Sequence, residues 1–312
     1  MKINPPGQFT HAPGFPVYVV RFASEDKVVL AGGGGPGNSG IRNKVTKLKI
    51  RPGQERLEEV ATFELDQGED TPMSLALHPA LSNVWVCGAN RKVEDLKHGG
   101  KGEGEKKEEG QGEEVDEVYS ISTLSSKDAD DYQRVAQISP DGRWLLTGSA
   151  SGKVCLRSFP NLEEPFPNLD TGIQSDIMDV DFDRRAGKFI AVQERQITIW
   201  DLQSGTVVDT LDSPMVNGDQ PGSFRHCRFG RGKTFGYAFA VVNTKDRKGA
   251  FVCKVSATTF GKVLIRSVHN KPITAFSISE KGDRLAYGTA DLGVGILDTD
   301  TLDVSEGEGI MD

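Results

Sequence analysis

A loose internal repeat constrains the fold of this chain more than any other feature of its sequence. Apolar segments, each followed by a polar turn and a second apolar segment, recur at intervals of 55, 61, 44, 47 and 49 residues. The first segments of these repeats end at Phe22, Leu77, Ile138, Phe182, Phe229 and Ile278. Short apolar segments spaced in this way predict a series of small antiparallel sheets.

Two of the repeats align without a gap. Residues 138–159 (ISPDGRWLLTGSASGKVCLRSF) match residues 278–299 (ISEKGDRLAYGTADLGVGILDT) with glycines and apolar residues at shared positions. A third repeat closes with residues 197–202, whose Trp-Asp pair is typical of WD-type propeller blades, as are the Pro-Asp-Gly turn at 140–142 and the period near 45. We therefore predict an all-β chain, a WD-type β-propeller with six readable repeats, in a single domain spanning residues 1–312.

Composition narrows the function classes. With 312 residues, 37% of them hydrophobic, the chain can bury a large core, and its sequence contains no apolar run of membrane-spanning length. The formal charge of −8 and the absence of a basic cluster argue against a nucleic acid as the main partner. The cysteines are far apart in apolar contexts, which predicts buried free thiols in a reducing compartment: Cys87, Cys155, Cys227 and Cys253.

Two insertions lengthen the first repeats. The second insertion, residues 90–116, is charged, rich in glycine and nearly free of apolar residues. Such a segment has too little apolar surface to bury, so we predict a disordered acidic surface loop, with an interaction tail as the alternative.

The first insertion is a glycine-rich loop between two apolar strands, within residues 31–46 (AGGGGPGNSGIRNKVT). Its six glycines would together lose about 3–6 kcal/mol relative to alanine if the loop is ordered, so an ordered loop needs a compensating interaction. Glycines allow successive carbonyls or amides to turn toward one point, which suits an ion, a phosphate or a partner's backbone. The alternative is a mobile tip without a role.

Two nucleotide-binding motifs match only in part. The glycines of 32–37 fit a dinucleotide fingerprint, but a strand follows them where that fingerprint needs a helix. Gly232-Lys233-Thr234 resembles the end of a phosphate-binding loop, but Cys227 stands where that motif has glycine. The sequence also shows no convincing Ser-His-Asp, Cys-His or paired-carboxylate arrangement, so an enzyme is the least favoured function class.

The opening of the chain resembles a known family. Residues 16–22 (PVYVVRF) lead to Leu30-Ala31, to four glycines and then to Gly40-Ile41-Arg42-Asn43-Lys44. This AGGGG segment followed by GI-x-N is similar to fungal-type exchange factors of the endoplasmic reticulum that load GTP onto the Sar-type small GTPase, the protein that starts COPII coat assembly. The vertebrate prolactin regulatory element-binding protein belongs to the same family.

The resemblance implies a seven-bladed propeller followed by a single membrane anchor, so we expect a C-terminally truncated monomeric piece at the cytosolic face of the endoplasmic reticulum. It also implies a potassium ion in the glycine loop, held mainly by backbone carbonyls. The expected ion site comprises Gly33, Gly34, Gly35, Asn38, Ser39 and Gly40. Contacts with the GTPase are expected at Pro36, Arg42, Lys44 and Pro72.

Two loop residues are the candidates for the exchange activity itself. Ile41 is an apolar side chain at an expected exposed tip, where it could act as a wedge, and Asn43 offers a donor and an acceptor to a partner's backbone. The alternative for both is a turn packed on its own blade. The alternative for the whole chain is a WD-repeat scaffold without exchange activity, because a propeller fold alone does not define a function.

Overall fold

The computed structural model describes residues 11–35, 39–51, 56–65, 71–81, 84–89, 92–98, 116–122, 131–167, 169–184, 187–216, 218 and 220–305. The backbone divides into two compact units, Met1–Leu145 and Leu146–Asp312, and each is considered by itself. No helix in the described ranges is long and apolar enough to cross a membrane.

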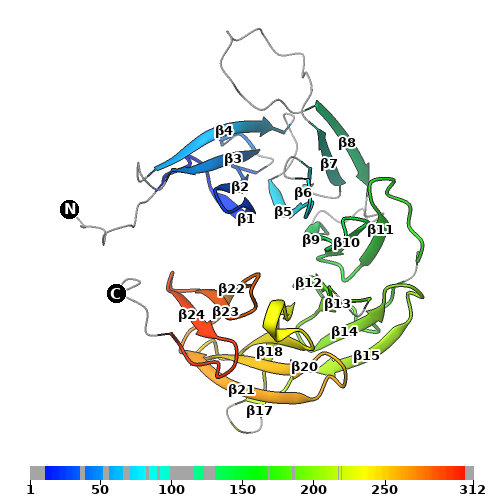
Figure 1. Ribbon diagram of the computed structural model, residues 1–312, viewed down its shortest axis with the longest axis vertical. Helices are drawn as coiled ribbons and strands as arrows, with labels where there is room; N and C mark the ends of the chain where they lie inside the picture. The colour runs from blue at the N-terminus through cyan, green and yellow to red at the C-terminus, as the bar shows by residue number, and fades with distance from the viewer. Residues whose placement is uncertain are drawn as a thin grey trace, which may run out of the picture. The chain divides into compact units, whose positions relative to one another are not determined.

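The first unit begins with two four-stranded antiparallel sheets whose strands follow one another in sequence order (Figure 1). The first sheet contains β1 (Val17–Ser24), β2 (Lys27–Gly32), β3 (Lys44–Arg51) and β4 (Arg56–Glu64). The second contains β5 (Pro72–Leu77), β6 (Trp85–Ala89), β7 (Lys92–His98) and β8 (Asp116–Ser122). Runs of apolar residues explain strands such as β2, which is buried over five consecutive residues because successive side chains point to opposite faces of a sheet and both faces are covered.

A buried cluster joins these two sheets. Val29, Ala31 and Val45 of the first sheet pack with Leu75 and Trp85 of the second. At about 25 cal/mol per Å² of buried apolar surface, such contacts between successive sheets are the main stabilising term. A single sheet could not bury both faces alone, which is why the sequence repeats.

A three-stranded sheet contains the division between the units. Its order is β11-β10-β9, with β9 (Gln133–Ile138), β10 (Trp144–Ser149) and β11 (Val154–Ser158). The predicted turn at Pro140-Asp141-Gly142 links β9 to β10: Gly142 has a φ of 73°, and the Asp141 carboxylate accepts a hydrogen bond from the backbone N–H of Arg143. The residue types at this position therefore predicted the turn correctly.

The second unit continues with three further sheets and a small hairpin. A four-stranded sheet comprises β12 (Asp179–Phe182), β13 (Lys188–Val192), β14 (Gln196–Asp201) and β15 (Val207–Asp212). A hairpin of β16 (Met215–Val216) and β17 (Gln220–Pro221) follows. The next four-stranded sheet contains β18 (Ser223–Phe229), β19 (Tyr237–Asn243), β20 (Ala250–Ser256) and β21 (Lys262–His269). The short 3₁₀ turn η2 (Gly232–Thr234) lies between β18 and β19. The last sheet has three strands, β22 (Ile273–Ile278), β23 (Arg284–Thr289) and β24 (Val294–Asp298).

Two apolar clusters hold the second unit together. One lies between the β12–β15 and β18–β21 sheets, and the other between the β18–β21 and β22–β24 sheets. Trp200 of the Trp-Asp pair is buried and stacks on Phe189 with ring centroids 5.2 Å apart. The neighbouring Asp201 carboxylate accepts hydrogen bonds from the backbone N–H groups of Gln203 and Ser204, so it closes the turn after β14.

The structure confirms the all-β prediction and the propeller-type sheets. The six predicted first segments correspond to β1, β5, β9, β12, β18 and β22. The seven blades implied by the resemblance are not found in the described ranges, which contain six sheets of three or four strands and one two-stranded hairpin. The WD type remains a prediction, and so does the description of residues 1–312 as one domain.

The predicted acidic loop needs a correction. Residues 92–98, within the predicted loop 90–116, form β7, which pairs with β6 and with β8. Charged strands are tolerated there because pairing satisfies their backbone groups even where the side chains are polar. Asp116, the last residue of the predicted loop, begins β8, and the other residues of the loop lie outside the described residues. All four cysteines are buried, as predicted.

Candidate functional site

The glycine loop connects β2 to β3 in the first sheet. The two strands are paired up to Gly32 and Lys44, so the loop leaves and re-enters the sheet at one point. Gly33, Gly35 and Gly40 have φ values of 151°, 84° and 76°. Side chains other than glycine are strained in that part of φ space, so the loop conformation itself requires glycine at these positions.

Close contacts also require glycine at two positions, Gly33, which has a positive φ as well, and Gly34. A Cβ atom added at Gly33 would lie 2.2 Å from Oδ1 of Asn43, and one added at Gly34 would lie 1.9 Å from Oγ of Ser39. The two ends of the loop therefore pack against each other. This packing is part of the interaction that offsets the conformational freedom of the glycines.

Asn43 fastens the loop from the inside. Its Oδ1 accepts a hydrogen bond from the backbone N–H of Gly35 at 3.0 Å, and its Nδ2 donates to the Gly35 carbonyl at 2.9 Å. Oδ1 also accepts a hydrogen bond from the Thr71 hydroxyl at 3.2 Å. We call Asn43, Gly35 and Thr71 the Asn43 cluster. Asn43 and Thr71 are 7% and 4% exposed, so the cluster is buried.

This geometry corrects the predicted placement of Asn43. The sequence suggested an exposed amide that offers hydrogen bonds to a partner, but the amide is buried and bonded to its own loop. An asparagine side chain carries a donor and an acceptor, so it can pair with both the backbone N–H and the backbone carbonyl of one residue, here Gly35. Asn43 therefore positions the loop from within.

Ile41 lies on the outer side of the same loop. Its side chain is 41% exposed, and its backbone N–H donates to the Ser39 hydroxyl at 3.3 Å. The expectation of an exposed apolar side chain is confirmed at this position. Exposed and apolar, Ile41 is available to a partner in a way that Asn43 is not.

The other predicted contact residues fall into three groups. Arg42 is exposed, with its Nε 3.9 Å from the Glu64 carboxylate, and the Lys44 Nζ lies 4.9 Å from the centroid of the Phe15 ring. Pro72 is buried at the start of β5, which contradicts its expected role as a surface contact. Pro36 and Asn38 lie outside the described residues.

The donor chemistry of the loop is compatible with an alkali cation. The predicted ion ligands in the described part are the backbone carbonyls of Gly33, Gly34, Gly35 and Gly40 and the Ser39 hydroxyl. These are hard oxygen donors, and the Gly35 carbonyl keeps a second lone pair beside its bond to Asn43. Among the described residues no group of three or more His, Cys, Asp or Glu side chains could hold a metal ion.

An analogous neutral bridge occurs in the second unit. The Asn243 Nδ2 donates to the Ile273 carbonyl at 3.0 Å, and its Oδ1 accepts from the Ile273 N–H at 2.9 Å. This amide joins the end of β19 to the start of β22, just as Asn43 joins the end of the glycine loop to its beginning. The same kind of bridge thus occurs in both units, and at Asn43 it holds the glycine loop.

A buried charged cluster joins the sheets of the second unit. The Asp179 Oδ2 at the start of β12 lies 3.1 Å from Nδ1 of His226, accepts a hydrogen bond from the Cys227 N–H at 3.2 Å and forms an ion pair with Arg228. Nε2 of His226 is bonded to the Thr274 carbonyl at 3.0 Å. We call Asp179, His226 and Arg228 the Asp179 cluster. It connects β12, β18 and β22.

The charges of Asp179 and Arg228 shift each other's pKa values. Burial alone would raise the pKa of Asp179, but the Arg228 charge and the His226 contact outweigh it and lower the pKa to about 2. Asp179 and Asp181 in turn raise the pKa of Arg228 against the effect of burial. For Asp181 burial prevails, so its pKa is raised even though Arg228 is near.

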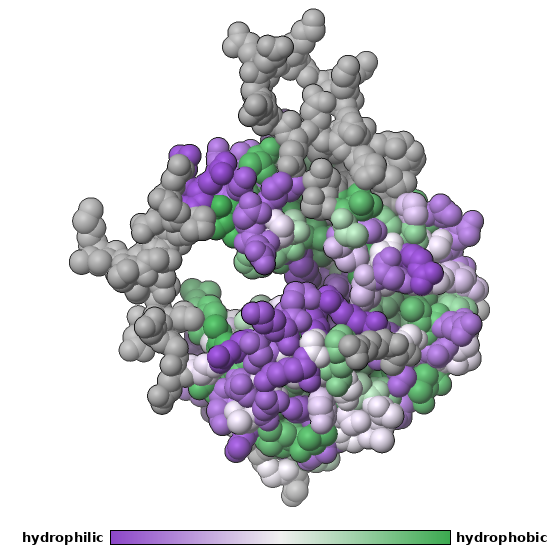
Figure 2. Space-filling view, viewed as in Figure 1, coloured by the Kyte–Doolittle hydropathy of each residue, from purple (hydrophilic) through white to green (hydrophobic). Residues whose placement is uncertain are grey.

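In the ion pairs near the surface of the second unit, each charged side chain lies beside one of opposite sign. Glu280 binds both Arg184 and Arg231, and Lys233 pairs with Asp300 at 2.7 Å. Figure 2 shows hydrophilic residues on the visible face of this unit. Such pairs contribute about 0–1 kcal/mol each, and they show no built anion site.

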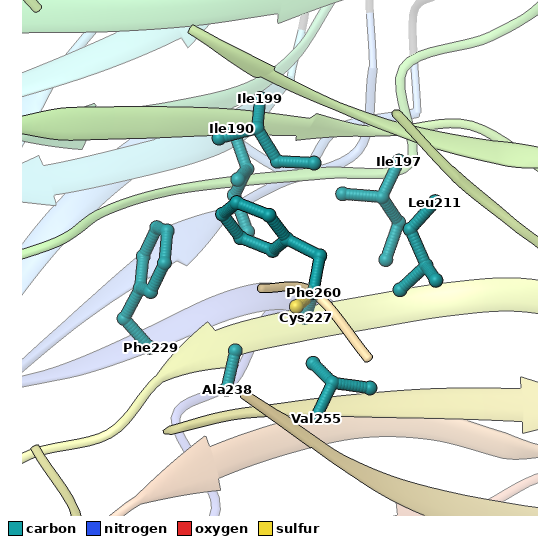
Figure 3. A pocket seen from close by; sticks show the side chains of 9 residues that line it. All are labelled: Ile190, Ile197, Ile199, Leu211, Cys227, Phe229, Ala238, Val255 and Phe260. Atoms are coloured by element: carbon teal, nitrogen blue, oxygen red, sulfur yellow. The ribbon is translucent and has the colours of Figure 1, made fainter. Parts of the chain in front are cut away.

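A small cavity lies among the apolar side chains of the second unit (Figure 3). Its volume is about 10 Å³, which is at the lower limit for one water molecule, and its lining offers no polar side chain to hold one. The lining residues are Ile190, Ile197, Ile199, Leu211, Cys227, Phe229, Ala238, Val255 and Phe260. The cavity is a gap in core packing, so the glycine loop remains the candidate site.

Comparison with known proteins shows which proteins this chain is similar to. No family model matches the chain. Over 200 residues, 62% of this chain and 42% of the relative, it is 26% identical to the guanine nucleotide-exchange factor SEC12 of Candida glabrata. It is also 22% identical over 298 residues, 93% of this chain and 28% of the relative, to SED4 of Candida glabrata, a candidate guanine nucleotide-exchange factor.

A third relative, SED4 of Saccharomyces cerevisiae, is 32% identical over 83 residues, which are 26% of this chain and 8% of that protein. The chain is thus similar to fungal proteins named as guanine nucleotide-exchange factors. It spans less than half the length of these relatives.

The main feature that sequence reasoning missed is Thr71. The residue precedes an apolar strand and belongs to no motif, and it comes from a different sheet connection than the loop it contacts. Only the packing of the second sheet against the first brings Thr71 to Asn43. No signal in a single sequence could have found it.

Proposed function

We propose that the chain is a guanine-nucleotide exchange factor for a Sar-type small GTPase. The observation that carries the proposal is the ordered glycine loop, which Asn43 fastens from inside while Ile41 is exposed. The similarity to SEC12, which is named as an exchange factor, supports the same activity. The GTPase partner comes from the resemblance of the AGGGG and GI-x-N segments.

The proposed mechanism requires no proton transfer and no nucleophile. A small GTPase holds its nucleotide through phosphate contacts and magnesium, so an exchange factor must bind the nucleotide-free state better than the loaded state. A protrusion does this if it occupies space that the switch region needs in the loaded state. Ile41 supplies an apolar protrusion, and removing it from water on binding contributes favourable free energy.

The remaining loop residues have supporting roles in this proposal. The fixed backbone around Asn43 lets the loop bind without losing conformational freedom at that moment, which favours affinity. Arg42 is exposed and can meet carboxylates of the partner, since its contact with Glu64 is long. Lys44 is half-buried over Phe15 and contributes less surface.

Potassium is part of the proposal as a bound ion of the loop. When bound, it would draw carbonyl oxygens toward one point and add to the interactions that offset the glycines' freedom. The carbonyls of Gly33, Gly34, Gly35 and Gly40 and the Ser39 hydroxyl are its proposed ligands. The chain's own part is to turn these oxygens inward, which the positive φ values at Gly33, Gly35 and Gly40 permit.

The cellular setting follows from the resemblance alone. We place the activity at the cytosolic face of the endoplasmic reticulum, where loading of the GTPase starts COPII coat formation for transport to the Golgi apparatus. The domain acts as a monomer, and a membrane anchor in the full-length protein would hold it there.

Release of a fluorescent guanine nucleotide from a Sar-type GTPase tests the function. The chain should accelerate release, and Ile41→Asp should bring the rate close to the spontaneous one. Leu81→Asp is a matched control, because Leu81 is 47% exposed in the same unit and lies outside the loop. Binding to the GTPase without faster release would favour the scaffold alternative, and equal loss in both variants would remove Ile41 from the site.

The ion is tested in the same assay. Release should slow when sodium or lithium replaces potassium at constant ionic strength, which holds charge screening fixed. Equal rates in the three salts would remove potassium from the proposal and leave the exchange activity itself untouched.

A further inference from the structure

The glycine loop is held by a residue of the neighbouring connection between sheets. Thr71 lies between β4 and β5, 28 residues along the chain from Asn43, and its hydroxyl donates to the Asn43 Oδ1 at 3.2 Å. The backbone N–H of Leu65, just after β4, donates to the Asn43 carbonyl at 2.9 Å. Asn43 is therefore where the β2–β3 loop meets both ends of the β4–β5 connection.

The hydrogen bonds of the Asn43 amide act together. Oδ1 receives bonds from Gly35 and Thr71, and Nδ2 donates to the Gly35 carbonyl. The amide cannot rotate about its Cβ–Cγ bond without breaking these bonds. Both Asn43 and Thr71 are more than nine-tenths buried, so water cannot readily replace the bonds that would be lost.

We propose that Thr71 is a positioning residue for the glycine loop. Through Asn43, it sets how often the loop is fastened in the conformation that presents Ile41. The inference rests on the proposed exchange function for its activity readout, but the fastening itself can be measured on the free protein.

The equilibrium between a fastened and an open loop links the hydroxyl to activity. Loss of one neutral hydrogen bond should shift this equilibrium toward the open loop by about 2- to 10-fold. If only the fastened loop is competent, activity follows the fastened fraction. Activity then falls less than the equilibrium constant does, because a loop that is mostly fastened remains partly fastened.

The test compares Thr71→Val with Thr71→Ser and a control. Valine keeps the shape but lacks the hydroxyl, whereas serine keeps the hydroxyl. Thr62→Val is the matched control, because it breaks the Thr62–Thr46 hydroxyl contact of 3.1 Å in the first sheet without touching Asn43.

Two readouts separate the inference from the proposed function. Hydrogen–deuterium exchange of the Gly35 amide reports the bond to Asn43 directly, and tryptic cleavage after the exposed Arg42 reports opening of the loop. Both should be about 2- to 10-fold faster in Thr71→Val than in the native chain or Thr62→Val, with Thr71→Ser near the native value. Nucleotide release should fall in the same order.

The outcomes are distinct. Unchanged Gly35 protection in Thr71→Val, or the same change in Thr62→Val, would overturn the inference. Slower nucleotide release in Thr71→Val at native Gly35 protection would also overturn it, since Thr71 would then act on the partner directly. Changed protection with a native chain that accelerates no GTPase would support the fastening and reject the exchange function.

Discussion

The Asn43 cluster of the first unit and the Asp179 cluster of the second perform a similar task by different physics. The first ties the glycine loop to the β4–β5 connection, and the second ties β12 to β18, each through a buried side chain. The first uses a neutral amide and a hydroxyl, and the second uses a carboxylate paired with a guanidinium. A neutral bridge holds geometry at little desolvation cost, whereas a buried ion pair is stable only while both partners are present.

The difference suits the two places. The glycine loop has an outer face with Ile41 exposed, and a neutral cluster beneath it does not respond to pH or salt. The Asp179 cluster lies inside the stacked sheets, where a broken pair would leave a charge without water. We therefore expect a larger loss of stability when the Asp179 cluster is disturbed than when the Asn43 cluster is disturbed.

Removal of Asp179 should have the largest effect on stability. Asp179→Ala leaves the Arg228 guanidinium buried without its carboxylate, which should lower the free energy of unfolding by about 3–5 kcal/mol. Urea unfolding measures this. Glu280→Ala removes a carboxylate that is mostly exposed and pairs with two arginines, so it should cost less than about 1 kcal/mol. Similar losses in both variants would show that burial of the pair is unimportant.

Acid should weaken the Asp179 cluster. The pKa of Asp179 is lowered from its ordinary value of 3.8 to about 2 in the folded chain, so the folded state binds the proton less readily than the unfolded state. Its contribution, about 2 kcal/mol, is present above pH 4 and is lost as the pH falls toward 2.

Asp181 acts in the opposite direction, because its pKa is raised on folding. Its contribution to folding is fully present below pH 3.8 and is lost as the pH rises through its raised pKa. Asp181→Asn should therefore abolish a loss of stability that the native chain shows as the pH rises above 3.8, and should keep the loss at lower pH that comes from Asp179. Urea unfolding over a range of pH measures both. Identical profiles of the native chain and Asp181→Asn above pH 3.8 would contradict the assignment.

A change in the Asn43 cluster should lower the stability of the chain less, and its exchange activity more, than a change in the Asp179 cluster. Asn43→Ala leaves the Gly35 peptide and the Thr71 hydroxyl without this partner, at a cost of about 1–3 kcal/mol, and nucleotide release should slow strongly. Asn243→Ala breaks the same kind of bridge at Ile273, so it should lose similar stability and keep the native release rate. Equal release rates in the two variants would make Asn43 purely structural.

Ile41 should show the smallest effect on stability. Ile41→Ala trims a side chain that is 41% exposed, so the free energy of unfolding should change by less than about 0.5 kcal/mol while nucleotide release slows. A melting temperature lower by several degrees at an unchanged release rate would place Ile41 in the core of the loop.

Local patterns made much of the fold predictable. The alternation of apolar residues located the first strand of each sheet, and Pro140-Asp141-Gly142 located a turn, because both depend on neighbours in sequence. The boundaries of the acidic loop were misjudged for a related reason. The charged strand β7 has no apolar period of its own and is ordered by pairing with β6 and β8.

The candidate site was predictable only in outline. Its glycines and the exposed Ile41 could be inferred from composition and position, since an ordered glycine-rich connection between strands has few uses. The direction in which Asn43 points could not. Its amide turns inward because Gly35 lies 8 residues away in sequence but at hydrogen-bonding distance in space.

The sequence by itself determined that this chain forms successive small sheets and carries a glycine loop between the second and third strands. These properties follow from side-chain periodicity and from the backbone freedom of glycine, which act over a few residues. Tertiary structure decided that Asn43 and Pro72 are buried, that Thr71 reaches Asn43, and that Asp179 is paired with Arg228. Those contacts join residues 28 to 49 positions apart, and only the packing of one sheet on the next brings them together.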